Sequence, residues 1–284
     1  MPELPEVETV RKGLTKYLQG GTISSVVLRR EGLRFPFPKD MSNRLINRRI
    51  EEIKRRAKYL LIRLDDDSTW LVHLGMTGKF TLFANESEFE EIGKHDHVIM
   101  RMQNGAIAVY NDPRRFGVMD LIEAGGEQNH RLLARIGCEP LSEKFNAKSL
   151  SKSIENKKSP IKTVLLDQRV VAGLGNIYVC EILNRAGVSP RRTASSVASS
   201  VGRTGSRCER IVEQTKQVLR EAIAAGGSTI SDFAAVDGDL GYFAHSFRVY
   251  GREGEACLTD SCNGTVKRIA QGGRSTFFCS KCQR

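Results

Sequence analysis

Four cysteines crowd the C-terminal end of the chain, in a stretch too short to fold around a hydrophobic core of its own. Their spacing is Cys257-x4-Cys262-x16-Cys279-x2-Cys282. Two close pairs separated by the length of a β-hairpin let four thiolates converge tetrahedrally on one zinc ion, and the pattern offers no vacant ligand position. The spacing therefore predicts a structural zinc ribbon over residues 246–284, with two disulfides as the alternative in an oxidising compartment.

The segment between the two cysteine pairs, GTVKRIAQGGRSTFF, predicts two alternating strands around Gly272-Gly273. Arg274 then lies at or just past the tip of the hairpin. A guanidinium group is planar, always charged and weakly hydrated, which suits it to hold phosphate. Taken alone, Arg274 is by default a solvated turn residue.

The hydrophobic pattern of the chain changes at the glycine pair of EAGGEQNH. Residues 1–125 contain an N-terminal helix and then alternating runs such as YLLIRLDDDSTWLVHLG, which predict an antiparallel sheet or sandwich. Residues 126–132 are the predicted linker, and residues 133–245 have the three-to-four-residue periodicity of four or more helices. We expect an α+β, two-domain fold, with a glycine-rich loop at about 226–243 that closes on a ligand.

Lysine and arginine number 44 against 33 acidic residues, and the formal net charge is +11. This excess favours a polyanionic partner, nucleic acid first, although charge alone is equally compatible with a solvated basic surface. No run approaches the roughly 18 apolar residues of a membrane span, and MPELPEVETV lacks the basic and apolar parts of a signal peptide. We therefore expect a cytoplasmic protein with no membrane partner.

Three predicted turns carry residues suited to contact nucleic acid. In VVAGLGNIYVCEIL, Asn176 is the predicted N-cap of a helix, where its amide and the first helical N–H groups suit a phosphate. A plain connection between helices is the alternative. The turns in HLGMTGK and YNDPRRFG contribute Met76, Arg114, Arg115 and Phe116. Exposed apolar residues at loop tips suit insertion into a base stack, whereas core packing is their ordinary explanation.

The first residues raise a separate question, because Pro5 suits the first turn of a helix but Pro2 and Glu3 have no evident part in it. If Met1 is removed, Pro2 carries a free secondary amine, and α-amino groups titrate near roughly pH 8, so modest tuning makes this amine a nucleophile. Attack on a sugar C1′ would expel the base, leave an iminium ion and allow β-elimination, with Glu3 moving the protons. An extended N-terminus that merely starts with proline is the alternative.

Together these segments resemble one family closely, bacterial formamidopyrimidine-DNA glycosylase. The matching segments run over nearly the whole chain: PELPEVET, RRAKYLL, HLGMTG, NDPRRFG, IKTVLLDQ, VAGLGNIY, VYGREGEAC, GRSTFFC and the CQ ending. One departure is the first cysteine pair, where the usual spacing of two residues is lengthened to four in CLTDSC. A longer knuckle can still close around zinc, so we expect metal binding to be retained.

The resemblance implies a bifunctional glycosylase and abasic-site lyase of base excision repair. Such an enzyme removes 8-oxoguanine and formamidopyrimidines from double-stranded DNA through an N-terminal proline Schiff base and β,δ-elimination. The implied fold is an N-terminal β-sandwich with flanking helices, a helix-two-turn-helix domain and a zinc ribbon, with DNA in the cleft and the loop at about 226–243 over the flipped base. One structural zinc ion and a monomer complete the expectation.

The resemblance also implies roles for particular residues. The implied catalytic residues are Pro2 as nucleophile, Glu3 as proton-transfer acid and base, Lys58 in RRAKYLL, and Arg274 on the phosphates that flank the lesion. The implied DNA contacts are Met76, His97, Arg114, Arg115, Phe116, Lys162, Asn176 and Arg274. Of these, Met76, Arg114 and Phe116 would fill the gap left by the flipped nucleotide.

Two alternatives stay open. Endonuclease VIII, the sister glycosylase for oxidised pyrimidines, shares the N-terminal proline, the helical domain and the finger, although the leucine of PELPE and the segment NDPRRFG favour the purine branch. A zinc-ribbon DNA-binding protein without catalysis would keep the basic surface but would have no use for Pro2, Glu3 and Lys58.

Overall fold

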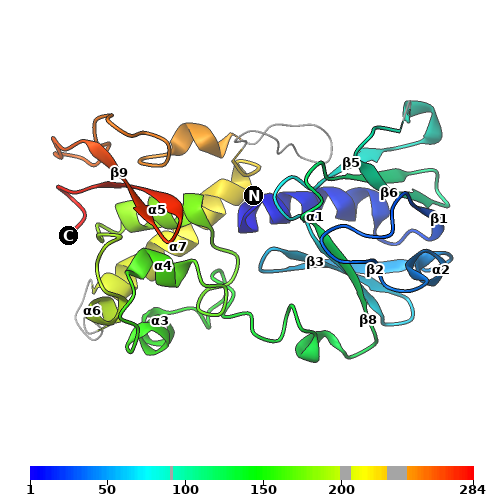
Figure 1. The fold of residues 1–284 in the computed structure, drawn as a ribbon, viewed down its shortest axis with the longest axis horizontal. Helices are drawn as coiled ribbons and strands as arrows, with labels where there is room; N and C mark the ends of the chain where they lie inside the picture. Colours follow the sequence, from blue (N-terminus) through cyan, green and yellow to red (C-terminus); the bar gives the residue numbers. More distant parts are fainter. Residues whose placement is uncertain (90–91, 199–205, 229–241) are drawn as a thin grey trace. The chain divides into compact units, whose positions relative to one another are not determined.

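The computed structural model describes residues 1–89, 92–198, 206–228 and 242–284. The chain divides into two units (Figure 1), and unit 1 comprises Met1–Ala134 with Ala225–Tyr242, whereas unit 2 comprises Arg135–Ala224 with Phe243–Arg284. Unit 1 contains the larger β-sheets, and unit 2 contains most of the helices and a β-hairpin, so the predicted α+β fold is confirmed. Within the described ranges, no helix combines the length and the apolar character needed to cross a membrane.

Unit 1 begins with helix α1 (Leu4–Leu18), which is followed by two four-stranded antiparallel sheets. The first sheet has the order β1 (Ile23–Leu28), β6 (Asp96–Met102), β7 (Ile107–Asn111), β5 (Lys79–Phe83). The second has the order β2 (Ile50–Arg56), β3 (Tyr59–Leu64), β4 (Thr69–His73), β8 (Val118–Ile122). The short elements are α2 (Met41–Leu45), η1 (Glu86–Glu88) and η2 (Glu127–Asn129).

One hydrophobic core joins α1 to both sheets. Val7, Val10 and Leu14 recur at helical spacing on α1 and are fully buried, as are Trp70 on β4 and Tyr110 on β7. Burying an aliphatic or aromatic side chain of this size contributes roughly 1.5–3 kcal/mol. The helix that follows the first three residues is therefore firmly attached to the sheets.

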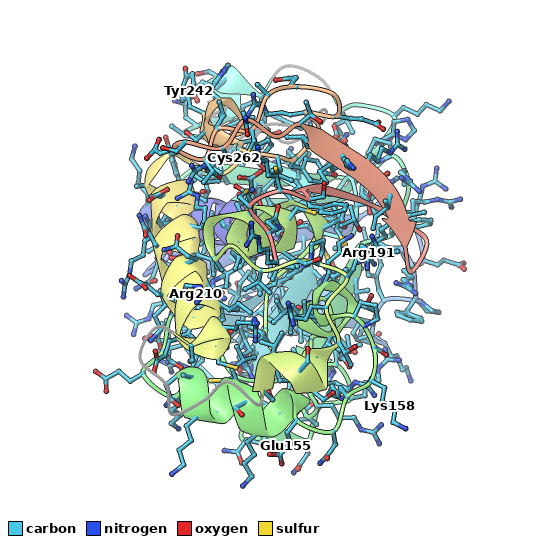
Figure 2. The ribbon with its side chains drawn as sticks, turned by 90° about the vertical axis from the view of Figure 1, so that its left-hand side faces the viewer. Glu155, Lys158, Arg191, Arg210, Tyr242 and Cys262 are labelled. Atoms are coloured by element: carbon cyan, nitrogen blue, oxygen red, sulfur yellow. The ribbon has the colours of Figure 1, made fainter. Side chains whose placement is uncertain are left out.

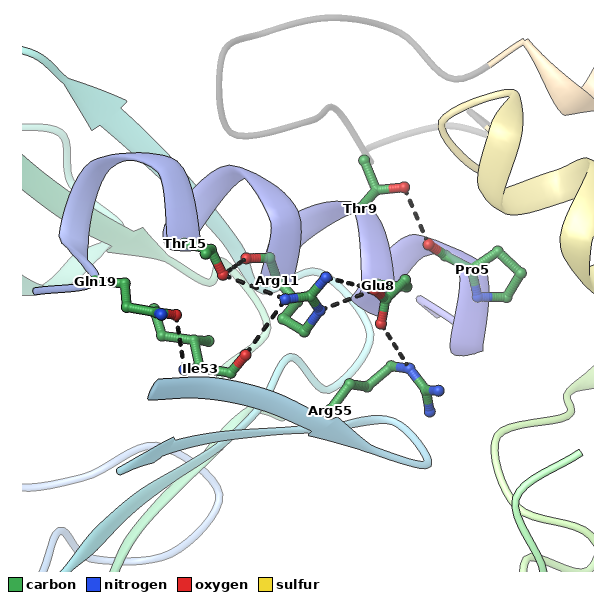
Figure 3. Close-up of polar contacts among 8 residues, drawn as sticks. All are labelled: Pro5, Glu8, Thr9, Arg11, Thr15, Gln19, Ile53 and Arg55. Atoms are coloured by element: carbon green, nitrogen blue, oxygen red, sulfur yellow. Dashed lines mark hydrogen bonds and ion pairs between the residues drawn. The ribbon is translucent and has the colours of Figure 1, made fainter. Parts of the chain in front are cut away.

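Polar contacts fix the same helix on strand β2 (Figure 3). Glu8 accepts hydrogen bonds from Arg11 Nε at 2.8 Å and from Arg55 Nε at 3.0 Å. Arg55 Nη1 also donates to the carbonyl oxygen of Ala57 at 2.9 Å. The side chains of Glu8 and Arg55 are only 16% and 10% exposed, so this ion pair is less screened by solvent than a surface pair. These contacts hold the turn after β2 in a defined position against α1.

Unit 2 contains five helices among its described residues and ends in a hairpin. The helices are α3 (Ala147–Ile154), α4 (Ile161–Leu165), α5 (Asn176–Arg185), α6 (Ala194–Ala198) and α7 (Arg207–Ala224), followed by η3 (Phe243–Ser246). The hairpin strands are β9 (Val266–Gln271) and β10 (Arg274–Cys279). Helix α5 packs against both α7 and β10. Figure 2 shows Lys158, Arg191 and Arg210 as basic side chains on different parts of this unit.

Candidate functional site

A reciprocal cap holds the N-terminal residues at the start of α1. Glu3 is the N-cap residue, its backbone N–H donates to Glu6 Oε2 at 2.9 Å, and its own side chain accepts from the Glu6 backbone N–H. This arrangement is a capping box with glutamate in the position that serine or threonine usually takes. Pro2 is buried, and Glu3 and Glu6 are 3% and 2% exposed. The cap therefore fixes Glu3, and Pro2 precedes it in a buried position.

The second carboxylate oxygen of Glu6 binds a residue far along the chain. Glu6 Oε1 accepts from the backbone N–H of Ser228 at 2.8 Å and from its hydroxyl at 2.9 Å. The preceding Gly227 has φ of +86°, and a Cβ there would lie 3.0 Å from Glu6 Oε1. The sequence analysis assigned no role to Glu6 and missed this link, although the Glu3-x-x-Glu6 spacing signals the cap. Residues 229–241 of the predicted loop lie outside the described residues.

Lys58 lies in the two-residue turn between β2 and β3 and is 5% exposed. The preceding Ala57 has φ of +53°, a conformation that is uncommon for a residue with a Cβ. On the neighbouring strand β4, burial lowers the pKa of His73 from 6.5 to about 4, and the charges of Lys58 and Arg34 add to the effect. The Lys58 ammonium thus lies close to a neutral imidazole in the interior of unit 1.

Two exposed loop tips carry the residues that were expected to enter the base stack. Met76 is 39% exposed and Phe116 is 43% exposed, so core packing does not account for either side chain. The Arg114 guanidinium lies over the Phe116 ring, 4.8 Å from its centre. Arg115, between them, has φ of +57° and is exposed. The loops therefore present one thioether, one aromatic ring and two guanidinium groups to solvent.

In unit 2, three of the predicted DNA contacts gather around the backbone of Ser275. Lys162 Nζ donates to Ser275 O at 3.1 Å and to the Thr276 hydroxyl at 2.7 Å, and Asn176 Nδ2 donates to Ser275 O at 3.0 Å. Arg274 is adjacent, exposed, and paired with Gln271 across the hairpin turn. The predicted N-cap role of Asn176 is wrong, since the N-cap is Gly175 and the amide of Asn176 serves the hairpin instead.

Two of the predicted DNA contacts, Lys162 and His97, are buried in this structure. Lys162 is 0% exposed, and its ammonium is directed to the hairpin as described above. His97 is 1% exposed, and its Nε2 lies 3.0 Å from the carbonyl oxygen of Asp112. Burial lowers the pKa of His97, with the charge of Arg30 acting in the same direction. The contact of these two side chains with DNA stays a prediction.

The four C-terminal cysteines converge as the spacing predicts. Their Sγ atoms all lie within 4.8 Å of one another, and the pairs Cys257–Cys282 and Cys262–Cys279 are each 3.7 Å apart. Tetrahedral zinc with Zn–S bonds of about 2.3 Å requires S···S distances of about 3.8 Å, whereas a disulfide requires about 2.05 Å. The donor set therefore fits one structural zinc ion, and the lengthened first knuckle does not prevent convergence.

A buried carboxylate that the sequence analysis missed ties α5 to the start of the ribbon. Glu181 is 0% exposed and accepts three backbone hydrogen bonds, from Arg248 at 2.8 Å, Val249 at 3.0 Å and Tyr250 at 2.8 Å. A carboxylate in an otherwise apolar helix face needs such donors, because an unsatisfied buried charge is costly. The only signal in the sequence was the charge within VCEIL.

Comparison with known proteins places these features in one family. A model of the formamidopyrimidine-DNA glycosylase N-terminal domain matches residues 1–119, and a model of the formamidopyrimidine-DNA glycosylase H2TH domain matches residues 136–234. Formamidopyrimidine-DNA glycosylases of Ruegeria sp. (strain TM1040) and Azorhizobium caulinodans are 49% and 50% identical over 289 and 293 residues, covering all of both chains.

Solved structures agree with the sequence comparison. MutM (Fpg) of Thermus thermophilus has a TM-score of 0.85 at 38% identity, over 99% of this chain and 98% of that chain. A Lactococcus lactis Fpg mutant in complex with DNA containing Fapy-dG has a TM-score of 0.88 at 33% identity, over the whole of both chains. A MutM complex with DNA containing carbocyclic 8-oxo-G has a TM-score of 0.87 at 33% identity, again over both whole chains. The chain belongs to the formamidopyrimidine-DNA glycosylase family.

Proposed function

We propose that this chain is a bifunctional DNA glycosylase and abasic-site lyase that removes 8-oxoguanine and formamidopyrimidines from double-stranded DNA in base excision repair. The observation that carries the proposal is the reciprocal cap between Glu3 and Glu6, which holds Glu3 in one orientation directly after the buried Pro2. A protein that only binds DNA would have no use for the amine of Pro2 and the carboxylate of Glu3 at this place. The family and the lesions bound by the Lactococcus lactis and MutM relatives support the same substrates.

In the proposed reaction Pro2, after removal of Met1, supplies the nucleophile. Its amine nitrogen bonds to C1′ of the damaged nucleotide, the bond from C1′ to the base breaks, and the base leaves with the electron pair and a proton. Glu3 protonates the ring oxygen as the sugar opens, which gives an iminium ion. Loss of a C2′ proton then expels the 3′ phosphate, a second elimination expels the 5′ phosphate, and water releases Pro2.

Lys58 is proposed to meet the DNA beside the reacting sugar and to assist catalysis. Its position in the turn after β2 is fixed by the contact of Arg55 with Glu8 of α1, the same helix that Glu3 caps. A buried ammonium beside a neutral imidazole is weakly solvated, so its charge acts strongly on a nearby phosphate or developing anion.

The remaining residues are proposed to hold the bent duplex. Arg274 binds the phosphates that flank the lesion, with Asn176 and Lys162 beside it around Ser275. Met76, Arg114 and Phe116 fill the gap left by the extruded nucleotide, since a glycosylase must take its target out of the stack. The roles are proposed to follow the predicted domains: residues 1–125 carry the chemistry, residues 133–245 bind DNA and residues 246–284 form the finger.

We place the protein in the cytoplasm, as a monomer on DNA.

Covalent trapping tests this proposal. The purified protein is mixed with an 8-oxoguanine:cytosine duplex and sodium borohydride, which reduces the iminium ion to a stable amine, and the adduct is mapped by mass spectrometry. We expect an adduct on the N-terminal peptide, with Met1 absent and Pro2 as the modified residue. An adduct with a dihydrothymine duplex alone would move the protein to the pyrimidine branch, and no adduct with either duplex would leave a DNA-binding protein.

A further inference from the structure

One buried carboxylate joins the two loops that carry the exposed residues of unit 1. Asp112 follows strand β7 and is 0% exposed. Its Oδ1 accepts from the hydroxyl of Thr77 at 2.6 Å, in the loop 74–78. Its Oδ2 accepts from the backbone N–H of Gly117 at 2.8 Å, at the far end of the loop 112–117. We call these two segments the wedge loops.

Further hydrogen bonds extend the connection. The Thr77 hydroxyl oxygen accepts from the backbone N–H of Arg114 at 3.2 Å, so Thr77 links the Asp112 carboxylate to the other loop. The backbone N–H of Arg115 donates to Asp112 O at 3.1 Å, and the Tyr110 hydroxyl lies 3.5 Å from Asp112 Oδ2. Burial and the Asp112 charge hold the pKa of Tyr110 well above its usual value, so Tyr110 stays a neutral donor.

The wedge loops also touch directly. Gly75, next to Met76, has φ of +66°, and a Cβ at this position would clash with the backbone of Phe116 and Gly117. Because Gly75 has no side chain, the backbone of loop 74–78 packs directly against the backbone of loop 112–117. Packed backbones and a shared carboxylate thus connect the two loops.

We propose that Asp112 is a positioning residue that joins the wedge loops into one rigid body and so sets where Met76 and Phe116 enter the duplex. The Thr77 hydroxyl takes part by linking the Asp112 carboxylate to the backbone N–H of Arg114. The inference rests on the proposed function. Extruding a nucleotide costs a few kcal/mol in unstacking free energy. Side chains on two independent loops would be displaced by this resistance, whereas side chains on two joined loops would keep their positions. Side chains that are held in position before binding lose less binding energy to their own ordering, so more of it is available to unstack the base.

The test replaces Thr77, because Thr77→Val keeps the shape of the side chain but removes both of its hydrogen bonds. Thr77→Ser keeps the hydroxyl and serves as the rescue. The matched control is Thr69→Val, which removes another hydroxyl of unit 1 that donates to a carboxylate, Glu127 Oε1 at 2.8 Å. Each variant is assayed on two duplexes, one with 8-oxoguanine opposite cytosine and one with a preformed abasic site, which leaves no stacked base to extrude.

We expect Thr77→Val to slow excision of 8-oxoguanine about tenfold, as the loss of one hydrogen bond to a charged group implies, and to slow cleavage of the abasic site less than twofold. A fluorescent base analogue opposite the lesion should report slower unstacking in the same variant. Thr77→Ser and Thr69→Val should match the wild type in both assays. The variant Asp112→Asn with Thr77→Val should lose less than the sum of the two single effects, since the two residues share one interaction.

Two outcomes would overturn the role of Asp112. One is a Thr77→Val variant that excises and unstacks like Thr77→Ser. The other is an equal loss on both duplexes, which would indicate general destabilisation. The wild type separates this inference from the proposed function, because a wild type that neither excises 8-oxoguanine nor forms an adduct contradicts the function itself. Thermal unfolding checks that the Asp112→Asn variant is folded. If that variant is not folded, the Thr77→Val variant alone tests the role of Asp112.

Discussion

The N-terminal helix of unit 1 and the hairpin of unit 2 each present a residue proposed to touch DNA, but they are held in place by different means. Helix α1 buries Val7, Val10 and Leu14 in a core shared by both sheets of its unit. The hairpin rests on a small cluster of Cys180, Val249 and Val266. Its position depends instead on four thiolates and on a few polar side chains, among them Lys162, Asn176 and Glu181.

Because the two regions are held differently, chemistry and DNA binding can be perturbed separately. Apolar packing is spread over many side chains, so a polar substitution at the start of α1 leaves the fold intact and changes only the reaction. A two-stranded hairpin is marginal by itself, and removing any one of its few attachments should change its position.

Removal of zinc should have the largest effect. Structural zinc contributes roughly 10–16 kcal/mol of apparent binding free energy to small domains, so chelation should unfold β9–β10 and reduce DNA affinity at least about a hundredfold. Unit 1 should stay folded, and Trp70, the single tryptophan of the chain, is fully buried there and reports on it by fluorescence. If Trp70 emission changed together with zinc release, unit 1 would also depend on the metal. If the protein without zinc bound DNA with normal affinity, the hairpin would not depend on it.

Glu3→Gln should abolish chemistry without affecting binding. Glutamine can still accept the Glu6 N–H, so the cap of α1 is kept, whereas proton transfer is lost, and positioned acid–base groups typically contribute about 10²–10⁴-fold. Single-turnover excision of 8-oxoguanine measures the loss, and fluorescence anisotropy measures DNA affinity, which should change less than threefold by the same reasoning. Wild-type excision rates in this variant would contradict the role of Glu3.

Arg274→Ala should weaken DNA binding about tenfold and lower the slope of log affinity against log salt by about 1, because one phosphate contact is lost. The matched control is Arg169→Ala, which removes an exposed guanidinium paired with Asp167 in the same unit. Affinity measured from low to high salt checks both variants. An unchanged slope for Arg274→Ala, or an equal decrease for Arg169→Ala, would argue against a specific phosphate contact.

Lys162→Met should have a smaller effect of the same kind. Methionine fills similar space but leaves Ser275 O and the Thr276 hydroxyl without the ammonium, at a cost of about 1–3 kcal/mol in the free energy of unfolding. DNA affinity should fall because Arg274 is displaced, so the double variant with Arg274→Ala should bind no worse than Arg274→Ala alone. Additive losses would instead indicate that Lys162 contacts phosphate directly.

Acid should weaken unit 1 by the smallest amount. The pKa of His73 is about 4 in the folded protein against 6.5, so the unfolded chain binds the extra proton first. Stability should therefore decrease as the pH falls from 6.5 toward 4, by roughly 1–3 kcal/mol. Protonation would also remove the acceptor for the Gly75 N–H at His73 Nδ1. His73→Asn, which keeps an acceptor, should flatten this dependence in Trp70 fluorescence; an unchanged slope would assign it to other groups.

Features encoded by local spacing could be predicted from the sequence. The cysteine cluster, the hairpin around Gly272-Gly273 and the helix behind Pro5 each depend on residues close together in the chain. The relation between Glu6 and Ser228 could not be predicted, because the two residues are 222 positions apart. For the same reason nothing in the sequence indicated that the residues around Ser228 group with unit 1.

Burial of charged side chains was the second limit. Lys162 and Glu181 lie in segments whose periodicity predicts helices correctly, but periodicity does not tell whether a charged residue on such a helix faces solvent or a buried partner. Glu181 binds backbone N–H groups, and Lys162 binds a backbone carbonyl and the Thr276 hydroxyl, so neither has a charged partner that the sequence could reveal. The wedge loops were recognised by their exposed residues, whereas the buried Asp112 that joins them was not.

The contact between Glu6 and Ser228 has a consequence for how the molecule is made. The ribosome releases the first helix of the chain long before it synthesises residue 228, and only then can Glu6 receive the two donors that Ser228 supplies. A nascent or truncated chain can thus carry Pro2 and Glu3 without the finished setting around them. The Pro2 amine is therefore made before the residue that completes the contacts of Glu6.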